Sequence, residues 1–463
     1  MIINQLRPSI LTLALLLVVA FGCKKADDTP IPAAPITPTN NDYGTPMQNV
    51  PTVDNMVMYE VNLRALSPLA NLQGVISRLD SIKALGVNVI WLMPIMRQGQ
   101  LRSVGSPYAI QNYKEVSPEY GTLADLRSLT DKAHQKGMAV ILDWVANHTS
   151  WDNPWIATTA WYTKDGSGNV ISPIVPGQTW NDVADLNFDN QDMRKAMIAA
   201  MKHWISEANV DGFRCDAADL VPYAFWKQAN DSLKRLTNRK IIMLAEGARA
   251  DHFTAGFQLN FAWDHFARLK DVFRTGALPS VLNSTHETEM RALNPSQRRL
   301  RFTSNHDESA WDATPINLFG GNNGSMAAFT IAAFSGGVPL IYSSQEVGRA
   351  ATVPFFSNTT INWSANRPML LQYRNLMQIY QSGPAWRSSR TTFIGDNNNW
   401  AVEKVSGQDT VLIVANVRNA ASTIVWPLTY TNRAWTNAVT GQPVTLANPA
   451  TMAPYGTLLL RRR

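Results

Sequence analysis

Cysteine is scarce in this sequence: the 463 residues include only Cys23 and Cys215. No disulfide framework is therefore available, and stability must come from the hydrophobic core. The formal net charge is +6 at pH 7, but Lys and Arg form no concentrated run, which argues against nucleic acid as a partner. No Gly-rich phosphate loop follows the first predicted strand, which argues against a dinucleotide site.

Long apolar runs are also absent, apart from residues 10–21. Arg7 precedes this run, which is too short to span a membrane as a mature helix and is typical of a signal peptide over residues 1–22. The run ends in Ala20-Phe21-Gly22-Cys23, which resembles a bacterial lipoprotein cleavage site with Cys23 as the lipidated residue. An ordinary secretory signal with an incidental cysteine is the alternative.

The segment after Cys23 is predicted to tether the protein to a membrane. Residues 23–52 are rich in Pro, Thr, Asn and Asp and carry no periodic apolar pattern, as in a flexible linker. Lys24, in place of Asp, favours sorting to the outer membrane. We therefore predict an exported, lipid-anchored protein on its periplasmic face or on the cell surface.

Eight apolar strands alternate with helices between residues 53 and 385. The predicted strands are residues 55–63, 87–95, 138–145, 210–216, 241–246, 256–261, 300–305 and 339–344. The predicted helices are residues 72–85, 123–136, 191–208, 225–238, 265–275 and 324–334. Strands that are apolar on both faces and alternate with helices indicate a parallel sheet covered by helices. Eight such units favour a closed (β/α)₈ TIM barrel over an open doubly wound sheet.

Two stretches depart from this alternation. Residues 148–186, after the third strand, are rich in Trp, Gly, Pro and Asn and are predicted to form a short inserted subdomain. Helical patterns end near Ala385, and short strands follow at residues 392–394, 400–405, 410–417, 422–427 and 456–461. Residues 386–463 are therefore predicted to form a C-terminal antiparallel β-sandwich domain.

Polar residues gather at the carboxyl ends of the predicted strands, the edge at which barrels carry their chemistry. They are Asp143, Asn147 and His148 after the third strand, Arg214 and Asp216 in the fourth, Glu246 in the fifth, and His306 and Asp307 after the seventh. Arg214 and Asp216 point the same way from their strand, so the guanidinium should lower the pKa of this carboxyl group. Taken alone, the pair could simply close a strand end. Several carboxylates, an Arg and two His on one rim are costly to assemble for stability alone, and two carboxyl groups could cleave an acetal as acid and nucleophile.

Four segments resemble, in order, signature regions of the α-amylase family (glycoside hydrolase family 13). They are Asp143-Trp-Val-Ala-Asn-His148, Gly212-Phe-Arg-Cys-Asp216, Leu244-Ala-Glu-Gly247 and Phe302-Thr-Ser-Asn-His-Asp307. The resemblance covers roughly residues 53–463. It implies that Asp216 is the nucleophile, that Glu246 is the general acid/base, and that Asp307 orients the sugar at the cleavage point.

The same resemblance implies supporting roles for five further residues. Arg214 would keep Asp216 ionised, and Asp143 would support the network. His148 and His306 would form hydrogen bonds with sugar hydroxyls, and Tyr108 would stack on the ring.

Two metal hypotheses accompany this interpretation. Asp143, His148, Asp216 and His306 could instead ligate Zn²⁺, although an Arg among them argues against it. The family often binds a structural Ca²⁺, and Asn147 and Asp185 match positions that serve it; oxygen ligands suit this ion. The sequence departs from the family nearby, because Asp219 and Leu220 replace a common Lys and the usual His. No organic cofactor is expected.

The resemblance implies a retaining, endo-acting hydrolase that cleaves α-1,4 bonds in starch-like glucans. An α-glucosidase, a cyclomaltodextrin hydrolase or a transglycosylase of the same family is the alternative, and a non-catalytic surface glucan-binding protein is another. The expected partners are the α-glucan and, through the anchor, a membrane; the sequence leaves the oligomeric state open.

Overall fold

The computed structural model describes residues 42–175, 177–236 and 238–462. The predicted signal peptide, the lipidation of Cys23 and most of the predicted linker lie outside these residues, so they and the predicted location stay predictions. No helix in the described part of the chain combines the length and apolar character needed to cross a membrane.

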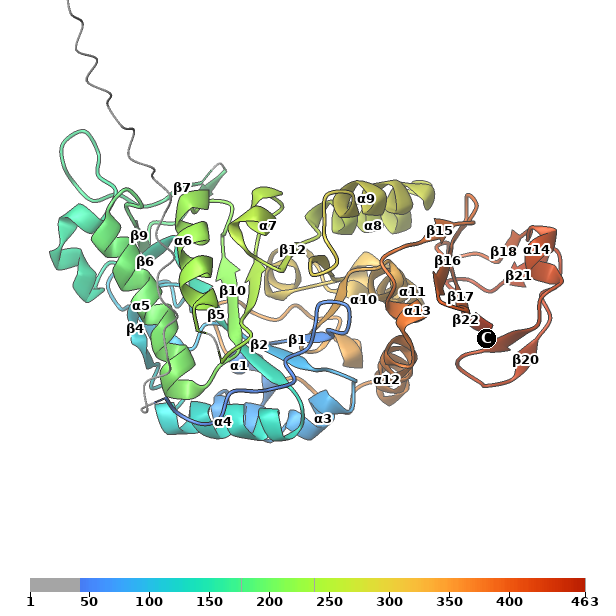
Figure 1. Ribbon diagram of the computed structural model, residues 1–463, viewed down its shortest axis with the longest axis horizontal. Helices are drawn as coiled ribbons and strands as arrows, with labels where there is room; N and C mark the ends of the chain where they lie inside the picture. The colour runs from blue at the N-terminus through green and yellow to red at the C-terminus, as the bar shows by residue number, and fades with distance from the viewer. Residues whose placement is uncertain (1–41, 176, 237, 463) are drawn as a thin grey trace, which may run out of the picture. The chain divides into compact units, whose positions relative to one another are not determined.

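Eight parallel strands form a closed barrel (Figure 1). They are β1 (Met58–Val61), β2 (Val89–Leu92), β5 (Ala139–Val145), β10 (Gly212–Asp216), β11 (Ile242–Ala245), β12 (Leu259–Phe261), β13 (Arg298–Arg301) and β14 (Val338–Tyr342). Neighbours in this order pair with each other, and β14 pairs with β1 to close the ring. Both faces of these strands are covered, as the seven buried residues of β5 illustrate, which is why they appear in the sequence as continuous apolar runs. All eight predicted strands and the predicted TIM barrel are confirmed.

Helices follow the strands of the barrel. The longer ones are α4 (Leu123–Gln135), α5 (Gln191–Ala208), α6 (Tyr223–Lys234), α8 (Trp263–Arg274), α9 (Ser280–Met290), α11 (Gly321–Phe334) and α12 (Arg367–Gln381). The shorter ones are α1 (Leu63–Leu66), α2 (Leu72–Ile76), α3 (Leu79–Lys83), α7 (Asp251–Ala255), α10 (Pro315–Leu318), α13 (Pro384–Arg387) and α14 (Leu428–Thr431). The single helix predicted over residues 72–85 is two short helices, and α9 and α12 were not predicted. A capping box starts α4, because Thr122 accepts from Asp125 N and Asp125 accepts from Thr122 N.

Two β-hairpin-containing segments connect barrel strands to the elements that follow them. The predicted insertion after the third strand contains β6 (His148–Ser150) paired with β9 (Val183–Asp185), and β7 (Ile174–Val175) paired with β8 (Gln178–Thr179). A second hairpin, β3 (Met96–Gln98) with β4 (Ile110–Val116), was not predicted. The connection between its strands carries Tyr108.

The C-terminal domain is antiparallel, as predicted. Its six-stranded sheet has the order β15 (Thr392–Phe393), β16 (Asn399–Ser406), β17 (Asp409–Asn416), β22 (Thr457–Arg462), β19 (Trp435–Asn437) and β20 (Pro443–Val444). A second sheet pairs β18 (Ser422–Ile424) with β21 (Ala450–Met452). Leu412, Trp426, Trp435 and Leu460 lie in a core of this domain's own.

The end of the predicted linker needs a correction. The flexible linker was expected to reach Thr52, but residues 42–52 contact the barrel domain. The Tyr43 hydroxyl donates to Asp131 Oδ2 at 2.6 Å, Asn209 Nδ2 donates to the Thr45 carbonyl at 2.8 Å, and Val50 is only 7% exposed. The polar composition misled the prediction because these contacts use backbone and side-chain polar groups as well as apolar burial.

Candidate active site

Three neighbouring strands bring the predicted charged residues to one rim of the barrel. Asp143 lies in β5, Arg214 and Asp216 lie in β10, and Glu246 directly follows β11. In the parallel register, Arg214 is the partner of Asp143 on one side and of Leu244, two residues before Glu246, on the other. Three carboxyl groups therefore surround one guanidinium group.

The Arg214 side chain is the centre of this cluster and is fully buried. Its Nη1 donates to Asp143 Oδ1 at 2.8 Å and to Asp216 Oδ1 at 2.9 Å, and its Nη2 lies 3.0 Å from Glu246 Oε2 as an ion pair. The Trp91 ring lies 4.9 Å from the guanidinium carbon and adds a cation–π contact. The Arg214–Asp216 pair seen in the sequence is therefore part of a network with three anionic partners.

Burial dominates the charge states of this cluster. It raises the pKa of Asp143 to about 6, while Arg214 acts in the opposite direction. It also raises the pKa of Asp307 to about 8, with a further contribution from Glu246. The pKa of Asp216 is raised for the same reason, which reverses the predicted direction: one guanidinium shared by three carboxyl groups does not outweigh desolvation. The carboxyl groups of this site therefore retain a proton near neutral pH, and because they interact they titrate together.

A second set of polar groups holds the other wall of the site. The Tyr108 hydroxyl donates to Asp143 Oδ2 at 3.0 Å and lies 2.8 Å from His306 Nε2, and the two rings stack with centroids 5.5 Å apart. His306 Nδ1 lies 2.5 Å from Glu60 Oε1, and its Nε2 lies 3.2 Å from Asp307 Oδ2. Burial and Arg214 lower the pKa of His306, so its imidazole is neutral. Sequence reasoning missed Glu60, whose only signal was one acid inside the apolar first strand.

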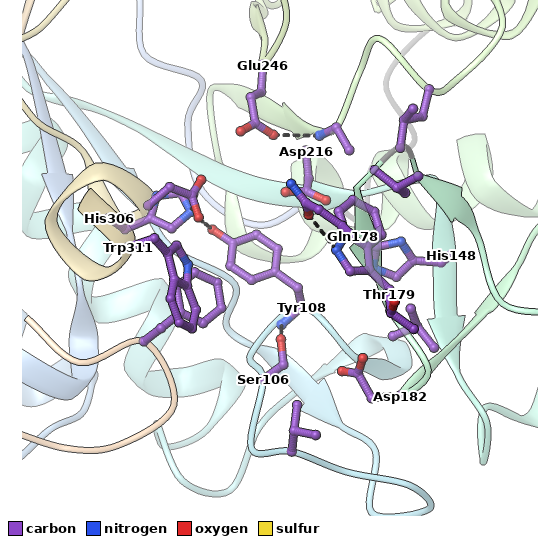
Figure 2. Close-up of a pocket in the computed structure, with 18 of the residues that line it drawn as sticks. Ser106, Tyr108, His148, Gln178, Thr179, Asp182, Asp216, Glu246, His306 and Trp311 are labelled. Carbon is purple, nitrogen blue, oxygen red and sulfur yellow. Dashed lines mark hydrogen bonds and ion pairs between the residues drawn. The ribbon is translucent and has the colours of Figure 1, made fainter.

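These residues surround one cavity of about 1160 Å³ (Figure 2). Its lining includes Tyr108, His148, Asp216, Glu246, His306 and Asp307. Asp143 and Arg214 lie behind this lining and contact it from the barrel interior. Burial lowers the pKa of His148 to about 4, so this side chain is also neutral. All the residues predicted for catalysis and substrate binding are therefore brought together.

The predicted calcium residues lie beside the cavity, on facing segments: Asp185 is the register partner of His148, and the Leu186 amide donates to the Asn147 carbonyl. Calcium takes six to eight oxygen ligands, and no group of three or more His, Cys, Asp or Glu side chains in the described residues is placed to hold a metal. Amide and backbone oxygens, on which the calcium hypothesis also relies, are not part of such a group, so the hypothesis stays a prediction and no reaction step is assigned to calcium. The zinc hypothesis is not supported, because Arg214 Nη1 binds both Asp143 and Asp216.

A closed (β/α)₈ barrel with paired carboxyl groups around one cavity at a rim is an arrangement that suits carboxylate-dependent glycoside hydrolases. The family model for the alpha-amylase catalytic domain matches residues 45–167 and 177–392. The chain therefore belongs to the alpha-amylase family of glycoside hydrolases.

Similar proteins agree with this assignment. Alpha-amylase 3 of Dictyoglomus thermophilum is 27% identical over 359 residues, which cover 66% of each chain. The probable oligo-1,6-glucosidase 2 of Bacillus subtilis is 33% identical over 199 residues, which cover 36% of this chain and 35% of the relative. An alpha-amylase structure from Lactobacillus plantarum superposes with a TM-score of 0.78 at 26% identity, and covers 89% of this chain and 99% of that one. The chain spans 66%, 44% and 64% of three curated amylase relatives.

Proposed function

We propose that this protein is a retaining, endo-acting hydrolase that cleaves α-1,4-glucosidic bonds of starch-like glucans. The observation that carries the proposal is the placement of Asp216 and Glu246 on the two nitrogens of one buried guanidinium, at the wall of one cavity. This holds a nucleophile and a proton donor at a fixed separation, as a double displacement requires.

Asp216 is the proposed nucleophile. Arg214 holds its Oδ1, and the described residues donate no hydrogen bond to its Oδ2, which is thus the oxygen available for attack. In the first step, this oxygen forms a bond to the anomeric carbon while the bond from that carbon to the leaving oxygen breaks. In the second step, a water oxygen displaces Asp216 from the same carbon and restores the carboxylate. Two inversions give net retention.

Glu246 is the proposed general acid and base. Its Oε2 accepts from the Ala217 amide at 2.7 Å and lies next to Arg214 Nη2, so negative charge is favoured on this oxygen (Figure 2). We therefore assign the transferable proton to Oε1. This proton passes to the leaving oxygen in the first step, and Glu246 takes a proton from the attacking water in the second.

The remaining residues orient the sugar. Among the described residues Asp307 forms no ion pair with Arg214; its Oδ2 lies 3.2 Å from His306 Nε2. Its raised pKa of about 8 favours the protonated form at neutral pH, which can donate to a sugar hydroxyl. Tyr108 presents a ring to the cavity, and His148 and His306 line it with neutral imidazole rings. Hydrogen bonds from neutral, pre-oriented groups suit an uncharged substrate.

Incubation of the protein with soluble starch tests the proposal through reducing ends, chain lengths and viscosity. Short oligomers with an early loss of viscosity are expected. Glucose as the only product would indicate an α-glucosidase, and longer chains a transglycosylase. Starch binding without turnover would identify a non-catalytic glucan-binding protein.

An aromatic wall of the cavity favours a polymer over a disaccharide as the substrate. Trp311 is 63% exposed and lines the cavity, with Phe355 and Phe356 at centroid distances of 5.5 and 5.7 Å. It lies in a π-helical turn, Glu308–Asp312, whose two ends are both ion-paired with Lys270 Nζ, at 3.2 and 2.9 Å. An exposed ring on a fixed turn can stack on a glucosyl ring away from the cleaved bond.

Replacing Trp311 with Ala is therefore expected to raise KM for maltoheptaose about fivefold, the equivalent of about 1 kcal/mol of aromatic contact. The kcat for maltoheptaose and both constants for a short aryl maltoside should stay unchanged, and Trp311→Phe should recover part of the loss. Steady-state kinetics on the two substrates make the comparison, and an equal effect on both would contradict a remote glucosyl contact.

A further inference from the structure

A hydrogen-bonded bridge connects the turn after β10 with the loop after β11. Asp219 lies three residues beyond Asp216, and its carboxylate accepts from the amides of the residues that follow Glu246. Asp219 Oδ2 accepts from Ala248 N at 3.0 Å, and Asp219 Oδ1 accepts from Arg249 N at 3.3 Å. Backbone donors to a carboxylate give charge-assisted hydrogen bonds, which are stronger than neutral ones.

The glycine after Glu246 makes this close approach possible. Gly247 has φ +157°, a conformation that L side chains rarely adopt, and a Cβ added to it would lie 2.3 Å from Asp219 Oδ1. Any other residue at this position would push the Asp219 carboxylate away from the loop. The Glu246-Gly247 pair is therefore matched to the carboxylate that faces it.

Arg249 strengthens the same bridge from the opposite direction. Its Nη1 donates to the Asp219 carbonyl at 2.9 Å and to the Val221 carbonyl at 3.2 Å. Its Nε and Nη2 donate to the Asp251 carboxylate at 3.0 and 2.7 Å. The guanidinium is thus held by three partners and cannot leave the turn after β10 without losing several hydrogen bonds.

Two further bonds fix Glu246 itself to the turn after β10. The Ala218 amide donates to the Glu246 carbonyl, at 2.9 Å, and the Ala217 amide donates to Glu246 Oε2. Ala217 has φ +43°, in the left-handed region, so its amide is aimed at the carboxyl group by a backbone conformation that costs free energy. Contacts on both sides of Glu246 therefore fix its position relative to the strand that carries Asp216.

We propose that Asp219 is a positioning residue for Glu246: it holds the loop after β11 so that Glu246 Oε1 faces the leaving oxygen. This inference rests on the proposed role of Glu246 as the general acid. Asp219 also borders the cavity, and its side chain is 41% exposed, but both of its oxygens are used by the loop amides. Its loss should weaken proton delivery and leave the attack by Asp216 largely intact.

Leaving-group dependence tests this proposal. Asp219→Ala and Asp219→Asn are compared with the unchanged protein on an alkyl α-maltoside, whose leaving group needs a proton, and on α-maltosyl fluoride, whose leaving group does not. A general acid contributes about 10²- to 10⁴-fold, and we expect Asp219→Ala to lose about tenfold of it in kcat/KM on the alkyl maltoside. The loss in kcat/KM on the fluoride should stay below about twofold, because this ratio reports the first step alone and not the second step, in which Glu246 acts as the base on both substrates. Asp219→Asn, which keeps one acceptor oxygen, should fall between Asp219→Ala and the unchanged protein.

Controls separate the possible outcomes. Glu246→Gln should show the same leaving-group pattern with a larger loss; if it shows none, the proposed function is wrong, whatever Asp219 does. Asp231→Asn, an acid on α6 that pairs with Lys227, should match the unchanged protein on both substrates. Equal losses on both substrates in the Asp219 variants would show that Asp219 has only a structural role. A rise in KM alone would show that Asp219 contacts the sugar. If Asp219→Ala does not fold, the loss on the alkyl maltoside is compared with the loss on the fluoride in Asp219→Asn instead.

Discussion

Replacing Asp216 with Asn is expected to lower kcat for starch by about 10⁴-fold or more, while the protein stays folded. The amide is nearly the same size as the carboxylate, and its oxygen can still accept from Arg214 Nη1, but it is too weak a nucleophile to form the glycosyl-enzyme. Losses of this size are typical when a covalent nucleophile is removed. Because the substitution removes one of several buried acids around a single cation, the melting temperature should be unchanged or higher.

The stereochemistry of a rescue reaction makes this prediction sharper. Asp216→Gly should open a space beside the anomeric carbon, and added azide can displace the fluoride of α-maltosyl fluoride there in one step. The product should be the β-maltosyl azide, with inverted configuration, which proton NMR identifies. An α-azide, or more than about one per cent residual hydrolysis in Asp216→Asn, would contradict the nucleophile assignment.

Most of the site could be predicted from the sequence because its residues occupy equivalent positions, at the carboxyl ends of the barrel strands. Asp143, Arg214, Asp216 and Glu246 come at or just after the ends of apolar strands, and parallel strands place their carboxyl ends on one edge. Side-chain alternation then puts Arg214 and Asp216 on the same face. These features depend on local pattern alone, and the structure has them as predicted.

Other features depend on long-range packing, which leaves little trace in the sequence. Glu60 contacts His306 from a strand 246 positions earlier in the chain, and no motif connects the two. The pKa direction of Asp216 was wrong because the sequence shows its neighbour Arg214 but not its burial or the other two acids that share the guanidinium. The Trp311 turn likewise depends on Lys270, which is on α8 and has no pattern in common with it.

The substitution with the largest expected effect on stability is Arg214→Met, because Arg214 compensates several buried acids at once. Removing one partner from a buried ion pair costs about 3–5 kcal/mol, and here three carboxyl groups lose their shared cation. We expect the free energy of unfolding at pH 7 to fall by at least this amount, as measured by urea denaturation. Hydrolysis should also be lost, since both Asp216 and Glu246 lose the group that holds them.

The pH dependence of this loss follows from the acids that remain. A carboxyl group whose pKa is higher in the folded protein binds more protons there than in the unfolded chain, so stability falls as pH rises from about 4 through the folded value. Asp143, with a pKa of about 6, and Asp216 already behave in this way. Without Arg214 both values should rise further, and the deficit of Arg214→Met should therefore be smallest near pH 5 and largest near pH 8.

Arg301→Met is the matched control for that measurement, since Arg301 is also fully buried in the barrel but pairs with one carboxylate, Glu289, at 2.5 Å. Its deficit should change less between pH 5 and pH 8. Adding Asp143→Asn to Arg214→Met removes one uncompensated acid and should restore part of the stability at pH 8. The amide has nearly the same shape as the carboxyl group, so this recovery would come from the lost charge and not from a change in packing. A deficit for Arg214→Met that is independent of pH, together with no recovery in the double variant, would mean that Arg214 stabilises the barrel by packing against Trp91 and its neighbours rather than by compensating charge.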